Sequence, residues 1–249
     1  MMKRSFLLIS VLFMFFVNSC STLLGEPMAA PVDTAASTME ATITRPTADA
    51  HWPTVVPPSA DFDYYVLALS WAPDYCSANP DDSQECSLGR KYGFVLHGLW
   101  PQYNSGYPSD CSNAPLPPSA KVQFPYLYPN DKLLEHEWSK HGTCSGLSAS
   151  AYLDLASKLK ERVQIPAAYV APSSPFRTTT DDLKKNFLQA NPLLTEASLA
   201  VNCSGSGRFL SELDVCISKD GRPAACGADV RKSALKSCSN ADFLVRNVK

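Results

Sequence analysis

The chain has 249 residues, with 22 basic and 24 acidic side chains and a formal net charge of −2 at pH 7. This balance excludes a protein that binds a polyanion through a broad basic surface, so any such contact must be local. The chain is long enough for a single domain with one hydrophobic core.

The N-terminus carries the features of an export signal. Lys3 and Arg4 precede an apolar run shorter than the ~20 residues that a membrane-spanning helix needs, so residues 1–19 are predicted to be a signal peptide. Because the small residue Ser19 directly precedes Cys20, we expect processing of the bacterial lipoprotein type, which lipidates Cys20 as the first mature residue. An ordinary signal peptide with an incidental Cys20 is the alternative.

Residues 20–60 are rich in Pro, Thr, Ser and Ala and have little periodic apolar pattern. Such a segment cannot bury enough surface to offset its ordering entropy, so we expect a flexible tether behind the lipidated cysteine. The folded domain is predicted to span residues 61–249. The protein would be a monomer exported to the periplasmic or extracellular face, lipid-anchored or otherwise secreted, and would contact a membrane through its N-terminal lipid alone.

The sequence contains nine cysteines, and setting Cys20 aside leaves an even number in the predicted domain. An even set behind an export signal indicates a disulfide framework formed in an oxidising compartment. Their spacing leaves the connectivity open, and the absence of a C-x-x-C pair argues against a structural zinc site. The domain cysteines are Cys76, Cys86, Cys111, Cys144, Cys203, Cys216, Cys226 and Cys238.

The first part of the domain is predicted to contain two strands and a long loop. Aromatic and branched residues over 64–71 indicate a buried strand that ends in a turn at Ala72-Pro73-Asp74. A second strand is expected over 92–100, ended by Pro101, because proline cannot donate to a sheet. Residues 102–129, rich in Pro, Ser, Asn and Tyr, are predicted to form the loop.

Helices are predicted for the middle of the chain. Helical spacing and capping residues indicate helices over 131–141, 148–163 and 180–190, the last capped by Thr180. Strands are expected over 198–203 and 209–218, followed by a turn at 219–222. Strands on both sides of a helical middle favour an α+β fold, with helices flanking a central antiparallel sheet in one disulfide-stabilised domain.

The candidate chemistry is concentrated in two short segments. The first is His97-Gly98-Leu99-Trp100-Pro101, and the second runs from His136 to Cys144. On a helix, the four ionisable residues of the second segment would share an arc of about 140°, as on an active-site face; a solvated surface helix is the alternative. These four residues are His136, Glu137, Lys140 and His141. Because Gly142 ends the helix, His141 lies at its C-terminal edge, where the dipole favours a protonated imidazole.

The spacing of these histidines favours chemistry without a metal or other cofactor. The zinc pattern H-E-x-x-H places two histidines one helical turn apart, whereas His136 and His141 would diverge by about 140°. Two histidines beside a lysine suit the cleavage of RNA, which carries its own 2′-hydroxyl nucleophile. A neutral imidazole removes that proton, a protonated one donates to the leaving 5′-oxygen, and the lysine stabilises the negative charge.

The two histidine segments closely resemble the two signature segments of the ribonuclease T2 family. Ser70 to Cys76 and Phe209 to Cys216 resemble two of its strands with their cysteines, and the similarity covers most of residues 61–238. The resemblance implies a central antiparallel sheet flanked by helices. It also implies metal-independent cleavage of single-stranded RNA to a 2′,3′-cyclic phosphate, which is then hydrolysed to a 3′-phosphate.

The resemblance also implies roles for individual residues. His97 matches the general acid and His141 the general base, two roles that swap in the hydrolysis step. His136 matches a phosphate contact, and Glu137 and Lys140 match the groups that stabilise the pentacovalent state. The disulfide pairs it implies are Cys76–Cys86, Cys111–Cys144, Cys203–Cys238 and Cys216–Cys226.

Base-binding residues are less well defined. Trp100 is either a stacking surface for a base or a core aromatic. Gln102 stands where some family members carry an acidic base-recognition residue, which leaves the base preference open. Tyr103 and Tyr107 are candidate neighbours of a base.

The sequence leaves two alternatives to a metal-independent ribonuclease. A catalytically inactive binding protein would have no physical reason to keep the whole set of histidines, lysine and glutamate. A metal-dependent lipoprotein hydrolase could use the same histidines, and activity in excess chelator distinguishes it from the metal-independent ribonuclease.

Overall fold

The computed structural model describes residues 60–249. The predicted signal peptide, Cys20 and all but the last residue of the predicted tether lie outside the described residues. The strands are β1 Tyr64–Trp71, β2 Phe94–Gln102, β3 Phe176–Thr178, β4 Leu199–Ser204, β5 Phe209–Ser218 and β6 Phe243–Val245. The α-helices are α1 Ala72–Ala78, α2 Ser83–Cys86, α3 Pro118–Gln123, α4 Asp131–Lys140, α5 Ala149–Arg162, α6 Thr180–Ala190 and α7 Ala228–Ser237. Short 3₁₀ helices lie at Gly142–Cys144, Ala167–Tyr169 and Glu196–Ser198.

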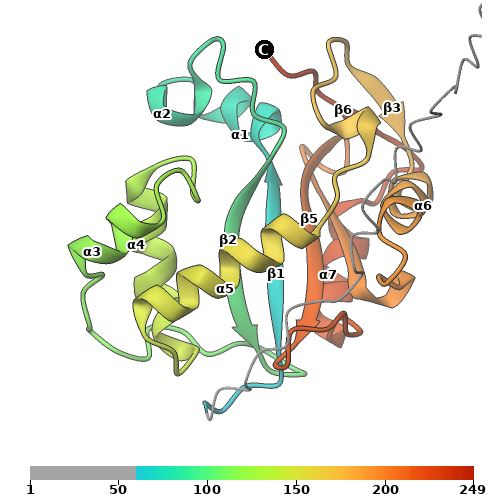
Figure 1. Cartoon of the computed structure of the whole chain (residues 1–249). Helices are drawn as coiled ribbons and strands as arrows, with labels where there is room; N and C mark the ends of the chain where they lie inside the picture. The colour runs from blue at the N-terminus through green and yellow to red at the C-terminus, as the bar shows by residue number, and fades with distance from the viewer. Residues whose placement is uncertain (1–59) are drawn as a thin grey trace, which may run out of the picture. The chain divides into compact units, whose positions relative to one another are not determined.

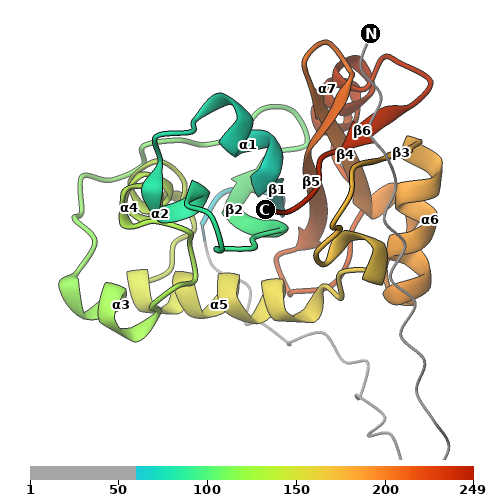
Figure 2. The same cartoon turned by 90° about the horizontal axis from the view of Figure 1, so that it is seen from above.

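A six-stranded sheet lies at the centre of the domain, in the order β2-β1-β5-β6-β3, with β4 also paired to β5. Its pairings are antiparallel except for the one between β5 and β6. In Figure 1, α5 crosses in front of β1 and β2, with α4 and α6 to either side. Figure 2 shows α5 and α7 on opposite faces of the sheet. The predicted α+β fold is confirmed. Within residues 60–249, no helix is long and apolar enough to cross a bilayer.

The two faces of the sheet bury different amounts of apolar surface. Side chains alternate along a strand, so Leu67 and Leu69 of β1 join the main core, which also contains Leu159 of α5. Val66 of β1 instead joins a smaller apolar cluster that includes Ala234 of α7. This second face is therefore incompletely covered by apolar packing, and it has room for polar side chains.

Both expectations based on proline were wrong. Strand β2 continues through Pro101, which pairs with Tyr65, to Gln102. Because β2 is an edge strand, no second neighbour requires the N–H that proline lacks. Residues 72–74 are not a turn but the beginning of α1, where Pro73 is tolerated because the first N–H groups of a helix have no intrahelical acceptor.

Other corrections concern short elements and their ends. The segment 102–129 is not a continuous loop, because it contains α3, and neither α2 nor α7 was predicted. The N-cap of α6 is Thr179 rather than Thr180, since the Thr179 hydroxyl accepts from the Asp182 N–H at 3.0 Å. The turn at 219–222 is confirmed by a backbone bond from Gly221 to Ser218 at 2.9 Å.

Four disulfides join the elements around the sheet, with the pairing that the resemblance implied. The first joins α1 to α2, and the second ties the loop before α3 to the turn after α4. The other two attach β4 to the end of α7 and β5 to the loop before α7. The pairs are Cys76–Cys86, Cys111–Cys144, Cys203–Cys238 and Cys216–Cys226.

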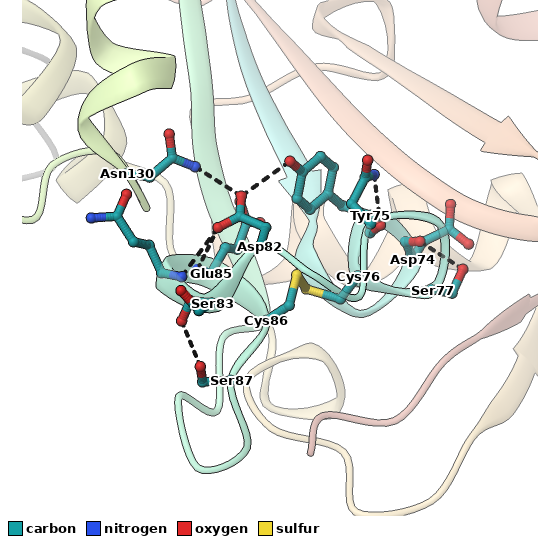
Figure 3. The surroundings of a disulfide bond; sticks show 12 residues. Asp74, Tyr75, Cys76, Ser77, Asp82, Ser83, Glu85, Cys86, Ser87 and Asn130 are labelled. Atoms are coloured by element: carbon teal, nitrogen blue, oxygen red, sulfur yellow. Dashed lines mark hydrogen bonds between the residues drawn. A yellow bond between two sulfur atoms is a disulfide. The ribbon is translucent and has the colours of Figure 1, made fainter.

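The loop closed by Cys76–Cys86 is attached to the start of α4 (Figure 3). Asp82 accepts from the Tyr75 hydroxyl and from the Asn130 side-chain amide through the same oxygen, both at 3.1 Å. Asn130 is also the N-cap of α4, because its side-chain oxygen accepts from the Leu133 N–H at 2.8 Å. Asp82 therefore couples the disulfide loop to the helix that carries the second histidine segment.

Candidate active site

His97 is the extra residue of a β-bulge. Leu96 and Gly98 pair with consecutive residues of β1, so residue 97 between them has no partner on that strand. The bulge lets Leu96 and Leu99, three positions apart, reach the same core, which strict alternation would not allow. The His97 side chain reaches the second face of the sheet, where it is 36% exposed.

A carboxylate on β5 holds His97. The imidazole Nδ1 lies 2.6 Å from Oε2 of Glu212, and the Ser70 hydroxyl donates to that same oxygen at 2.8 Å. Burial alone would lower the pKa of His97, but the hydrogen bond and the charge of Glu212, helped by Glu137 and Asp214, raise it overall. Glu212 is a site residue that the sequence analysis missed.

Glu137 is buried beneath the site, with 1% of its surface exposed. Its Oε2 accepts from the Trp100 indole N–H at 2.6 Å, and its Oε1 lies 3.8 Å from the His97 Nε2. A Cβ on Gly98 would lie 2.1 Å from both Oε2 and the indole nitrogen, so this bond requires glycine there. Burial raises the pKa of Glu137 to about 7, against the opposing charge of His97 and the Trp100 hydrogen bond.

His141 is also buried, with 7% of its surface exposed, and it is the C-cap of α4. The expectation that the helix dipole keeps this imidazole protonated was wrong. Burial, together with the positive charges of Lys140, His136 and His97, lowers its pKa to about 4. Desolvation and three cations outweigh the dipole, whose effect is typically worth under ~2 kcal/mol.

Trp100 lies beside both catalytic candidates. Its ring centroid is 5.0 Å from that of His97 and 5.4 Å from that of His141. The two remaining ionisable residues of the second segment are accessible to solvent, with His136 exposed and Lys140 half-buried. The predicted arc is thus divided: Glu137 turns into the protein, and the cations face outward.

The candidate base contacts differ in accessibility. Tyr107 is 54% exposed, and its ring centroid lies 6.0 Å from that of His141. Tyr103 is half-buried and packs against the main core, whereas Gln102 is 7% exposed. Burial removes most of the Gln102 side chain from reach of a base, so it does not join the site that the histidines form.

A cavity of about 690 Å³ opens beside His97 and His136. Its other wall comes from the Cys76–Cys86 loop and includes Tyr75, Asp82 and Glu85. Burial and the nearby Asp82 charge raise the pKa of Glu85 to about 7. The volume lies in the range of small-molecule sites in proteins, so the cavity can accept a group of nucleotide size.

A sequence model described as the ribonuclease T2 family matches residues 62–226. The chain belongs to the ribonuclease T2 family. The match includes both histidine segments and strand β5 with Glu212. The protein is therefore a ribonuclease, and RNA is its substrate class.

Named relatives agree with this assignment. A ribonuclease of Aeromonas hydrophila is 39% identical over 192 residues, covering 77% of this chain and 88% of the relative. A probable ribonuclease of Haemophilus influenzae is 32% identical over 183 residues, covering 67% of this chain and 62% of its own length. Among solved structures, ribonuclease MC1 from bitter gourd seeds aligns with a TM-score of 0.57 at 23% identity, over 73% of this chain and 99% of that one. The likeness to ribonuclease MC1 supports the fold of the chain alone.

The other functions are not favoured by these observations. A binding protein without activity has no need of the His97–Glu212 contact or of a buried Glu137. In the described part of the chain, no group of three or more His, Cys, Asp and Glu side chains is arranged to hold a metal ion. His136 is exposed while His141 is buried, so these two do not form a chelating pair.

Proposed function

We propose that the enzyme is an endoribonuclease that cleaves single-stranded RNA by transphosphorylation to a 2′,3′-cyclic phosphate, then hydrolyses this product to a 3′-phosphate without a metal. The observation that carries the proposal is the opposite electrostatics of two histidines beside one indole ring. The pKa of His97 is raised and that of His141 is lowered to about 4. Near neutral pH, one imidazole is therefore ready to donate a proton and the other to accept one.

In the first step, neutral His141 takes the proton of the 2′-hydroxyl. The 2′-oxygen forms a bond to phosphorus while the bond from phosphorus to the 5′-oxygen breaks. Protonated His97 donates to that leaving oxygen through Nε2, since its Nδ1 is bonded to Glu212. In the second step a water takes the place of the leaving nucleoside, and its oxygen forms a bond to phosphorus while the bond from phosphorus to the 2′-oxygen breaks. His97 takes the proton of the water, and His141 returns its proton to the 2′-oxygen.

The remaining predicted residues surround the reacting phosphate in this proposal. Oε1 of Glu137 faces the His97 Nε2 across 3.8 Å, so a phosphate next to that nitrogen is within reach of the Glu137 carboxyl. With its pKa raised to about 7, Glu137 is partly protonated near neutral pH and can donate to a phosphoryl oxygen. Lys140 and His136 supply positive charge to the pentacovalent state. Trp100 and Tyr107 provide aromatic faces for a base.

The test is the product chemistry of the purified full-length protein. Incubation of the protein with an RNA dinucleotide in excess EDTA should release a 2′,3′-cyclic phosphate first and a 3′-phosphate later. Mass spectrometry of the products over time distinguishes the two. The matched substrate with a 2′-deoxy sugar should remain intact because it lacks the nucleophile. Loss of cleavage in EDTA and its return with a divalent metal would favour the metal-dependent alternative instead.

We also propose that the protein acts outside the cytoplasm as a monomer, anchored by a lipid on Cys20. Four disulfides in one domain support an oxidising compartment. The basic, apolar and small-residue pattern that ends at Cys20 supports lipidation. The proposed tether over 20–60 would let the domain reach RNA away from the membrane.

A further inference from the structure

Behind His97, the second face of the sheet carries a cluster of polar side chains from three strands. Ser70 comes from β1, Asn202 from β4, and Glu212 and Asp214 from β5. They lie on neighbouring register positions: Ser70 and Asn202 each pair with Glu212. Polar groups in the middle of a sheet are costly to desolvate unless they bond to one another or serve a function.

The hydrogen bonds define which His97 nitrogen carries the reactive proton. Oε2 of Glu212 already accepts from the Ser70 hydroxyl, and a carboxylate can accept a second bond but not donate one. At 2.6 Å, the His97 Nδ1 must therefore be the donor to that oxygen. Nε2, which faces Glu137 and the site, is left as the nitrogen that gains and loses a proton.

Asp214 is the buried carboxyl group of this cluster. It is 6% exposed and accepts from the Asn202 amide at 2.7 Å. Burial and the neighbouring Glu212 raise the pKa of Asp214 well above its ordinary value. Of the two carboxyl groups, Glu212 is the one that contacts the His97 ring.

We propose that Glu212 is a positioning residue that fixes the His97 ring through Nδ1–H and keeps the imidazole charged until Nε2 gives its proton to the leaving oxygen. The inference rests on the proposed role of His97 as general acid. The titratable groups that face His97 are Glu85, Glu137, His141, Glu212 and Asp214. Glu212 is the one that is hydrogen-bonded to the ring, so its charge acts at the shortest distance.

Two variants separate the charge of Glu212 from its orienting bond. In Glu212→Gln the amide oxygen still accepts from Nδ1–H, but the negative charge is gone. We expect the pKa of His97 to fall in an NMR titration, and the alkaline limb of the kcat profile to move to lower pH by the same amount. On the plateau between the two limbs, kcat should stay within a few-fold of wild type, because His97 is protonated there in both proteins.

Glu212→Ala removes the orienting bond as well. It should show the same fall in the pKa of His97 and an additional loss of about 10- to 100-fold in the plateau kcat, by analogy with the partners that orient metal-ligating histidines. Asp154→Asn is the control, since Asp154 pairs with Lys158 on the exposed side of α5. Asp154→Asn should change neither the pKa of His97 nor the plateau kcat.

The tautomer of His97 can be measured in the wild-type protein, so this test does not depend on whether a variant folds. At high pH, the ¹⁵N shifts of neutral His97 should report the Nδ1–H tautomer; the Nε2–H tautomer would overturn the proposal. So would an unchanged His97 titration in Glu212→Gln. If the enzyme makes no cyclic phosphate, the proposed mechanism fails, while the NMR experiments still decide whether Glu212 controls His97.

Discussion

The indole N–H of Trp100 donates to Glu137 at 2.6 Å, directly over Gly98. Trp100→Phe keeps the aromatic surface but leaves the buried carboxyl without this donor. We expect a stability loss of about 1–3 kcal/mol, typical of a buried group that loses its partner, and a reduced kcat. Trp138→Phe is the matched control, because it also loses a buried indole bond, to the Ala114 carbonyl. It should lower stability in urea unfolding but leave kcat within a few-fold.

The proposed acid and base should each be essential to the chemistry. His97→Ala and His141→Ala are expected to lower kcat by about 10²- to 10⁴-fold each, and the double variant should be little worse because both act in one step. His136→Ala should cost less, since His136 supplies charge and transfers no proton. Circular dichroism serves as the folding control. Retention of more than about a tenth of the wild-type kcat in either essential variant would contradict the assignment.

The pH–rate profile should be a broad bell. His141 acts as a base when neutral, so the rate should fall as the pH drops through about 4. His97 acts as an acid when protonated, so the rate should fall again above its raised pKa. A rate that climbs without a break to about pH 9 would point to a different base.

Lys140 should set the position of the acid limb. Its charge is the second cause, after burial, that lowers the pKa of His141. Lys140→Gln should therefore raise that pKa and move the acid limb of kcat to higher pH. Lys158→Gln removes an exposed lysine of α5 and should leave the limb in place. An acid limb that does not respond to Lys140 would mean that His141 is not the group titrating there.

The Cys111–Cys144 disulfide should matter for both stability and activity, because Cys144 lies three residues after His141. Replacing both cysteines by serine should cost roughly 2–5 kcal/mol and lower kcat by loosening the site. The matched control replaces Cys203 and Cys238, which close a loop of similar length between β4 and α7. That variant should lose comparable stability and retain kcat. Equal losses of kcat in the two would argue against a local effect.

Cys20 is tested by the mature N-terminus. When the chain is expressed with its own leader in a bacterium, intact mass should reveal a lipidated Cys20 and the protein should partition into membranes. Cys20→Ser should appear as a soluble or unprocessed form. An unmodified Cys20, or a mature chain that begins beyond it, would contradict the anchor and leave a soluble enzyme.

Local patterns in the sequence were sufficient for much of the fold and for the histidines. Aromatic and branched residues identified β1, and helical spacing with capping residues identified α4 and α5, since each of these patterns is set by neighbours within a few positions. His97 and His141 stood out because each lies in a dense motif. Helix α7 was missed because its apolar face is small, with Ala234 as its one buried residue.

Non-local contacts account for what could not be predicted. Glu212 lies 115 positions from His97, and their contact depends on β5 and β2 both flanking this end of β1. The low pKa of His141 arises from burial, which helical periodicity does not reveal. The burial of Gln102 was not foreseen for a similar reason, since β2 continues past Pro101 and takes Gln102 into the sheet.

The β-bulge makes His97, the proposed general acid, an insertion in the hydrogen-bonded ladder. Leu96 and Gly98 already face consecutive residues of β1, so a chain without residue 97 would have an unbroken register and the same core. Deleting His97 is therefore expected to be milder for folding than deleting Leu96 or Leu99. The sheet and the proposed proton donor are structurally separable, because the strand register on either side of His97 does not depend on that residue.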